Sequence, residues 1–159
     1  MNVSDLTKTL AEILLSKNWT MSLAESCTGG LVCATLTELA GSSEWFERGY
    51  ITYSNEAKSE CLDVPVDLIE SHGAVSEQVA KAMAEGTRIN SGSNVAISIT
   101  GIAGPAGGSV EKPVGTVCFG WATENQTLTK TMRFEGARQM IRQDATEFAL
   151  SELIALLRS

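Results

Sequence analysis

A short apolar run, Val95 to Ile99, constrains the fold of this chain more than any other feature. Only Ser98 interrupts the run with a polar side chain, and polar residues bound it on both sides. Such a strand is typical of the centre of a sheet, where helices cover both faces. Segments with apolar residues at spacings of three and four, which predict helices, precede and follow it. We therefore expect an α/β protein.

The remaining pattern fills in this architecture. Helices are expected at about 4–17, 29–40, 56–62, 65–72, 77–90 and from 137 onward, and strands at about 20–25, 48–53, 95–99, 114–122 and 127–134. Gly41 ends the second helix, Pro65 takes the first position of the fourth, and the last two strands form a hairpin across Glu124 and Asn125. We predict one domain, residues 1–159, folded as a three-layer α/β/α sandwich with a mixed, mostly parallel sheet.

The charge of the chain argues against nucleic acid as a partner. The formal net charge is −7, whereas proteins that bind phosphate backbones present a basic patch. The excess of acids lies in residues 1–80, and residues 81–159 are nearly balanced. Bases that converge in the second half suit a small anion better than a duplex.

Neither a membrane segment nor an export signal is present in the pattern. No apolar run approaches the roughly 20 residues that span a bilayer. The first segment carries Asp5 and Glu12 among its leucines, which indicates an amphipathic helix and not a signal peptide. We therefore expect a cytoplasmic protein with no membrane partner.

Cysteine and histidine positions exclude a zinc site of the usual spacing. The four cysteines, at positions 27, 33, 61 and 118, form no Cys-x-x-Cys pair, and His72 lies far from each of them in sequence. This argument does not reach Mg²⁺ bound by carboxylates. We predict no metal and no cofactor, and we expect the cysteines to be buried thiols.

A glycine-containing elbow joins the first strand to the second helix. It contains Ser26, Cys27 and Thr28, followed by Gly29 and Gly30. The start of a helix offers free N–H groups and the positive end of the helix dipole, which favour an anion or a developing oxyanion. Ser26 has two interpretations at this position, because serine is also a common cap of a helix N-terminus.

Two further polar segments follow predicted strands. They begin at Tyr53 and at Thr100, and the second continues to Gly108 with four glycines and a proline after Thr100. Ligands of open α/β sheets bind beyond the carboxyl ends of the strands. If the three strands are neighbours, these segments and the elbow meet in one pocket. The glycine-rich segment is either a tight connection or a backbone cradle for a ligand, and it lacks the Gly-Lys-Ser/Thr of a Walker motif.

Lys58 is the base that suits Ser26 best. A lysine whose pKa is lowered by burial can take the proton of a hydroxyl. The alternative is a solvated lysine beside Glu56 and Glu60. His72 follows a predicted surface helix, which disfavours a serine–histidine pair.

Several other residues have more than one interpretation. Cys27 is a rival nucleophile but has no nearby histidine to ionise it. Arg138 and Arg142 share one helix face, and they either bind a phosphate, pair with Glu135 or cover apolar surface. The aromatic residues Trp45, Phe46 and Trp121 belong either to the core or to an interface between copies.

Six segments carry a recognisable pattern: AESCTGG at 24–30, YITYSNEAK at 50–58, GAVSEQVA at 73–80, SITGIAGPAGG at 98–108, KPVGTV at 112–117 and F-x-G-x-R-x-x-I-R at 134–142. They resemble the CinA C-terminal-domain family, whose stand-alone members are nicotinamide-nucleotide amidases. The segments occur in order over nearly the whole chain, so together they are highly specific.

The resemblance implies hydrolysis of nicotinamide mononucleotide to nicotinate mononucleotide and ammonia without a metal. It implies Ser26 as nucleophile, Lys58 as general base, and Tyr53 and Thr100 as supporting polar residues. Contacts with the substrate are expected from the elbow, the two later segments and the last helix; the residues are Cys27, Thr28, Gly29, Gly30, Asn55, Gly101, Gly104 and Arg142. The phosphate has three candidate positions, namely Thr28, the loop from Gly101 to Gly108, and Arg142.

One alternative function belongs to a different class. The family name comes from an association with competence and recombination, which suits a non-catalytic module that binds nucleotides or docks a partner. A homodimer or a higher homo-oligomer is compatible with either function.

Overall fold

In the computed structural model, which describes residues 1–159, five strands form one sheet in the order β2–β1–β3–β4–β5. The strands are β1 (Met21–Glu25), β2 (Phe46–Ile51), β3 (Val95–Gly101), β4 (Thr116–Thr123) and β5 (Thr127–Arg133). β1 pairs in parallel with β2 and β3, whereas β4 pairs antiparallel with β3 and β5. Only β4 therefore runs against the others, which confirms the mixed, mostly parallel sheet and the terminal hairpin.

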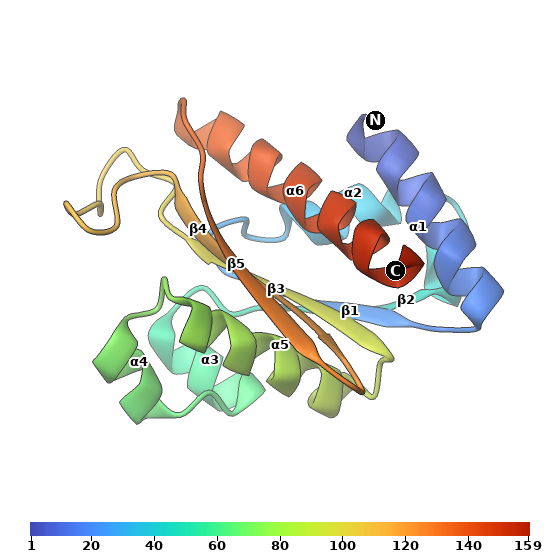
Figure 1. The fold of residues 1–159 in the computed structure, drawn as a ribbon, viewed down its shortest axis with the longest axis horizontal. Helices are drawn as coiled ribbons and strands as arrows, with labels where there is room; N and C mark the ends of the chain where they lie inside the picture. Colours follow the sequence, from blue (N-terminus) through green and yellow to red (C-terminus); the bar gives the residue numbers. More distant parts are fainter.

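Helices cover both faces of this sheet (Figure 1). One face carries α1 (Val3–Lys17), α2 (Leu31–Thr37) and α6 (Arg138–Arg158), and the other carries α3 (Asn55–Leu62), α4 (Val66–His72) and α5 (Glu77–Ser91). A short 3₁₀ turn, η1 (Ser42–Glu44), precedes β2. The three-layer α/β/α prediction is confirmed. None of the helices is long and apolar enough to cross a membrane.

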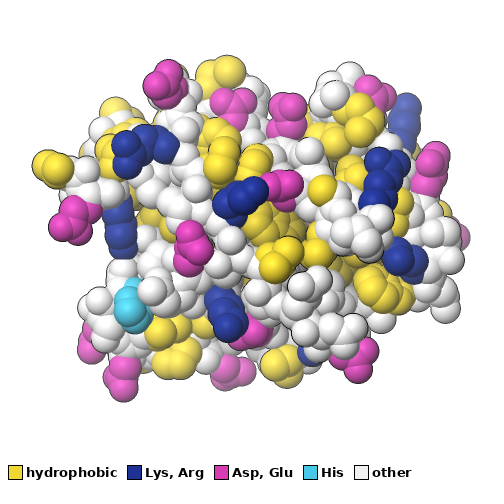
Figure 2. All heavy atoms as spheres, in the orientation of Figure 1, with side chains coloured by type: hydrophobic (Ala, Val, Ile, Leu, Met, Phe, Trp, Pro, Cys, Tyr) yellow, Lys and Arg dark blue, Asp and Glu magenta, His cyan; other side chains and the backbone are white.

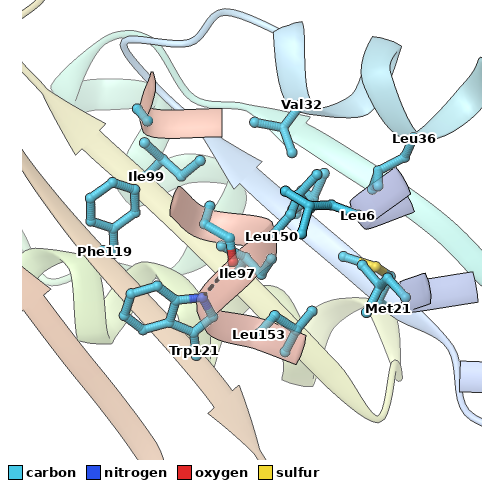
Figure 3. Packing of buried hydrophobic residues seen from close by; sticks show 14 of the residues in the cluster. Leu6, Met21, Val32, Leu36, Ile97, Ile99, Phe119, Trp121, Leu150 and Leu153 are labelled. Carbon is cyan, nitrogen blue, oxygen red and sulfur yellow. Dashed lines mark hydrogen bonds between the residues drawn. The ribbon is translucent and has the colours of Figure 1, made fainter. Parts of the chain in front are cut away.

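The larger hydrophobic core lies between the sheet and α1, α2 and α6. It contains 24 buried residues, and it includes alternate side chains of β3 and β4 such as Ile97, Phe119 and Trp121 (Figure 3). The Trp121 indole N–H donates to the carbonyl of Ala149 at 3.1 Å, which satisfies the one polar atom of that ring. Trp45 is buried in the same core and the partly buried Phe46 packs against it, so both contribute to the core of the chain.

The opposite face of the sheet is built from small side chains. Its hydrophobic cluster has 6 buried residues, and α5 lies close to the strands. The Ser98 hydroxyl donates to the Ala80 carbonyl of α5 at 2.5 Å. A Cβ on Gly120 would lie 2.6 Å from that same carbonyl oxygen, so only glycine permits this approach.

Some predicted boundaries are wrong. α2 ends at Thr37 and not near 40, where the Thr37 hydroxyl bonds back to the carbonyls of Cys33 and Ala34. Gly41 accordingly precedes η1 and does not end the helix. β2 begins at Phe46, earlier than expected, because it pairs there with Met21 of β1. Pro65 is the N-cap of α4 and not its first helical residue, since its ψ of 132° is extended.

Charged side chains of both signs are mixed on the surface, and the four thiols differ in exposure. Acidic and basic side chains are interspersed over the face in Figure 2, and no basic patch extends across it. Cys27 and Cys118 are buried, but Cys33 is half-buried and Cys61 is exposed. The expectation of four buried thiols is therefore wrong for Cys61, which lies on the outer side of the short helix α3.

Candidate active site

The three polar segments meet at one edge of the sheet, as the sequence predicted. β2, β1 and β3 are neighbours and run in parallel, so their carboxyl ends lie together. The chain continues from β1 to β2, which lies on one side of β1, and β3 lies on the other side of β1. A crevice therefore opens beyond the carboxyl end of β1, where Ser26 follows the last strand residue.

Alternation along β1 decides where Ser26 points. Ser22 and Ala24 face the α3–α5 layer, since Ser22 bonds to Ser93 there and Ala24 belongs to the smaller cluster. Ser26 continues this series. Its Oγ lies 3.1 Å from Nζ of Lys58, and both side chains are buried. The solvated interpretation of Lys58 is wrong, because only 1% of this residue is exposed. Ser26 caps no helix; the residue before α2 is Gly30.

The Lys58 amine has an unusual environment for a buried lysine. Nζ donates to the carbonyl oxygen of Thr52 at 3.0 Å and lies 3.4 Å from that of Tyr53. No carboxylate pairs with it, since the two salt bridges of the protein lie elsewhere. Burial lowers the pKa of Lys58 below its ordinary value, against smaller opposite effects of Cys27 and Glu56. A neutral amine can accept the Ser26 proton and still donate to two carbonyls.

A cavity of about 170 Å³ opens beside this pair. Its lining includes most of the predicted site residues and adds Ala74, Val75, Ala103 and Arg138; the complete set is Ser26, Cys27, Tyr53, Asn55, Lys58, Ala74, Val75, Thr100, Gly101, Ala103 and Arg138. The structure therefore brings residues from 26 to 138 into one polar pocket. Five predicted substrate contacts do not line it, namely Thr28, Gly29, Gly30, Gly104 and Arg142.

The supporting residues contribute in different ways. Tyr53 offers its backbone carbonyl to the pair, whereas the residue as a whole is 61% exposed and its hydroxyl lies 3.4 Å from Arg138. The Thr100 hydroxyl donates to the carbonyl of Ala74 at 3.0 Å and so ties a wall of the cavity to β3. A Cβ on Gly101 would come within 2.9 Å of the Thr116 carbonyl oxygen, so glycine is required there.

The start of α2 is not the free anion site that the sequence predicted. The Glu25 carboxylate accepts from the N–H groups of Gly30, Val32 and Cys33 at 2.9–3.1 Å. Glu25 is the residue that sequence reasoning missed, although its position opposite Ser26 in the alternation of β1 indicates that it faces α2. The N–H groups of Cys27 and Thr28, by contrast, make no hydrogen bond to another residue.

The two arginines of α6 hold the surrounding loops. Arg142 donates to the carbonyls of Cys27 and Thr28 at 3.1 and 2.8 Å. Arg138 donates to the Gly104 carbonyl at 2.8 Å and lines the cavity. Neither pairs with Glu135. Of the two guanidinium groups, that of Arg138 is therefore the one at the cavity, and that of Arg142 is occupied by the elbow.

The rival nucleophile and base are disfavoured. Burial raises the pKa of Cys27 to about 12, helped by the Glu25 charge, so its thiol stays protonated. His72 is exposed at the end of α4 and does not line the 170 Å³ cavity. It borders a larger cavity of about 730 Å³ that shares only Val75 with the site. No three side chains of His, Cys, Asp or Glu are grouped as a metal site would require.

Comparisons with known proteins agree with one another. Residues 3–157 match the CinA C-terminal domain family. The chain is 53% identical over 145 residues to a CinA-like protein from Syntrophobacter fumaroxidans, a match that covers 91% of this chain and 34% of that protein. It is 49% identical over 147 residues to the nicotinamide-nucleotide amidohydrolase PncC from Enterobacter agglomerans, covering 92% of this chain and 90% of that protein.

A solved structure shares the complete fold. The crystal structure of the competence damage-inducible protein A (ComA) from Klebsiella pneumoniae matches with a TM-score of 0.96 and 37% identity, over 99% of this chain and 98% of that one. The relatives are of two lengths. The chain spans about a third of the CinA-like protein and about nine tenths of the amidohydrolase.

Proposed function

The chain belongs to the CinA C-terminal domain family, and from this membership and the geometry at Ser26 we propose that it hydrolyses nicotinamide mononucleotide to nicotinate mononucleotide and ammonia. The single observation that carries the proposal is the distance of 3.1 Å between Ser26 Oγ and Lys58 Nζ inside a polar cavity. A relative named as a nicotinamide-nucleotide amidohydrolase, similar over nine tenths of its length, supports the choice of substrate.

Acylation begins at Ser26. Lys58 accepts the Oγ proton while Oγ attacks the carboxamide carbon, and a tetrahedral oxyanion forms. We assign that oxyanion to the N–H of Cys27, which lines the cavity and makes no hydrogen bond to another residue. Lys58 then donates its proton to the amide nitrogen, because an amide nitrogen leaves only when it is protonated. The C–N bond breaks, ammonia departs and an ester to Ser26 remains.

Deacylation uses the same groups with water. Lys58 takes a proton from a water molecule that attacks the ester carbon, and the new oxyanion again accepts from the Cys27 N–H. Collapse of this intermediate breaks the bond to Ser26, and Lys58 returns the proton to Oγ. The product forms as the carboxylic acid and gives its proton to water to become the free carboxylate, so every step is completed with these residues and water.

Arg138 is the cation that we assign to the anionic end of the substrate. The start of α2 is closed by Glu25, and Arg142 is occupied by two carbonyls. Thr28 is fully buried and does not line the cavity. Of the phosphate positions that the sequence left open, the loop after Gly101 remains, and Arg138 lies against it through Gly104.

Ammonia release from nicotinamide mononucleotide tests the proposal. We expect release by the wild type, and a loss of roughly 10³-fold or more in Ser26→Ala and in Lys58→Met. Ser22→Ala is the matched control, because Ser22 lies on the same face of β1 and bonds to Ser93 away from the cavity. An unchanged rate in Ser26→Ala contradicts the serine mechanism. Tight nucleotide binding without any turnover by the wild type indicates the non-catalytic alternative instead.

A further inference from the structure

We propose that Glu25 is a positioning residue for the oxyanion site of this protein. Its carboxylate fixes the start of α2 and the elbow, so that the N–H of Cys27, which lines the cavity, stays free for the substrate. The inference rests on the proposed function, since an oxyanion forms only if the site cleaves an acyl bond. It concerns a residue that precedes Ser26 in the chain but whose carboxylate binds the start of α2 and does not line the cavity.

Glu25 is buried without an ion-pair partner. Glu25 is 0% exposed, and no lysine or arginine lies within ion-pair distance of it. Burying a carboxylate is costly unless hydrogen bonds and dipoles compensate it. The compensation here is the start of α2, which supplies three N–H donors and the positive end of its dipole. An ordinary helix start needs only a serine or an aspartate at its cap.

Some backbone N–H groups of the elbow and of the start of α2 are bonded within the protein, and others are free. Gly30, Val32 and Cys33 give their N–H groups to Glu25, and Gly29 gives its own to the Ser26 carbonyl. The Cys27 and Thr28 N–H groups are the two in the elbow that remain. Gly29, which lies between these two sets of donors, adopts φ of +55° and turns the chain there.

Arg142 holds the elbow from the side opposite to Glu25. Arg142 holds the carbonyl of Cys27, and this carbonyl and the Thr28 N–H belong to the same planar peptide. The Thr28 N–H therefore points away from Arg142. Glu25 fixes one end of the elbow and Arg142 holds its carbonyl side, so the direction of the free N–H groups is determined before substrate binds. Such preorganisation is what makes oxyanion donors effective.

The test compares Glu25→Gln with Glu77→Gln. Glu77 is a matched control, because its carboxylate also lies in the first turn of a helix and accepts two hydrogen bonds, from Thr129 and Thr131 at 2.7 Å each. We expect kcat for nicotinamide mononucleotide to fall roughly 10²- to 10³-fold in Glu25→Gln with KM changed less than about threefold. We expect Glu77→Gln to keep the wild-type kcat. Equal kcat values for the two folded variants overturn the proposal.

Glu25→Asp keeps the experiment decisive where the amide variant does not fold. The shorter side chain retains the charge but cannot reach all three donors, so kcat should fall about tenfold with KM held. A folded Glu25→Asp with the wild-type kcat also overturns the proposal.

Amide resonances separate this inference from the proposed function. In ¹⁵N-labelled protein, Glu25→Gln should shift the Cys27 and Thr28 N–H signals and speed hydrogen exchange at Val32, whereas Glu77→Gln should leave them unchanged. If the wild type releases no ammonia, the proposed function fails, and these signals alone decide whether Glu25 positions the elbow. Unmoved signals in Glu25→Gln overturn the positioning role even in an active enzyme.

Discussion

The face of the sheet under α1, α2 and α6 carries large apolar side chains, whereas the face under α3, α4 and α5 carries small and polar ones. The first holds a cluster of 24 buried residues and the second a cluster of 6. Neighbours in sequence show the contrast: Phe119 enters the large core, and Gly120 allows the backbone of α5 to approach. The difference teaches that one face supplies most of the hydrophobic stability while the other brings helices close enough to place a buried lysine against a serine.

Consecutive residues of the first strand make the same division at the site. Glu25 faces the layer of α2 and closes its start, and Ser26 faces the layer of α3 and meets Lys58. A shift of one residue in the register of β1 would exchange these two side chains. The large core and the site therefore depend on a single register, which the pairing of β1 with β2 and β3 fixes.

The largest effect on stability is expected from the large face, in Phe119→Ala. The ring is fully buried and stacks on Trp121 and packs against Phe148, with centroids 5.6 and 5.0 Å apart. We expect the free energy of unfolding to fall by about 3–5 kcal/mol, while kcat of the folded protein stays within about twofold. Urea unfolding and ammonia release measure the two quantities. A large loss of kcat without a loss of stability would contradict the proposal that this face contributes stability and the other face contributes the site.

Gly120→Ala makes the matching change on the small face. A Cβ would lie 2.6 Å from the Ala80 carbonyl and 2.7 Å from Ser98 Oγ, so α5 must move outward. We expect a loss of about 1–3 kcal/mol in unfolding free energy together with a loss of about tenfold in kcat/KM. The activity falls because Ala74 and Val75, which line the cavity, lie just before α5. Per unit of stability lost, this variant should lose more activity than Phe119→Ala; the reverse ranking contradicts the comparison.

Much of this arrangement could be predicted from the sequence, and the exceptions have physical reasons. The α/β/α layers, the family and the meeting of three loops follow from periodicity, motifs and the rule for strand ends. The prediction of a free anion site at the start of α2 is wrong, because the Glu25 carboxylate occupies that site in the folded protein. Glu25 lies before the elbow in sequence, so the local pattern around the glycines does not include it. Strand order and the burial of Lys58 depend on tertiary contacts between distant segments, which local patterns do not contain. The assignment of Lys58 as base remains a prediction for the kinetic tests.

The smallest effect concerns how the buried amine of the small face makes stability depend on pH. The pKa of Lys58 is lowered by burial, so at pH values between its native pKa and the ordinary 10.5 the unfolded chain binds more protons than the folded one. Stability therefore rises with pH across this interval. Lys58→Met removes the titrating group, and below the native pKa only the wild type must bury a charge. The unfolding free energy of Lys58→Met relative to the wild type should be highest at low pH and decline as the pH approaches 10.5. Denaturant unfolding of both proteins across that range measures the difference, and a difference that grows with pH contradicts a lowered pKa. Lys8→Met is the control and should show no such trend. Lys8 is an exposed lysine on α1, one of the helices that cover the large face.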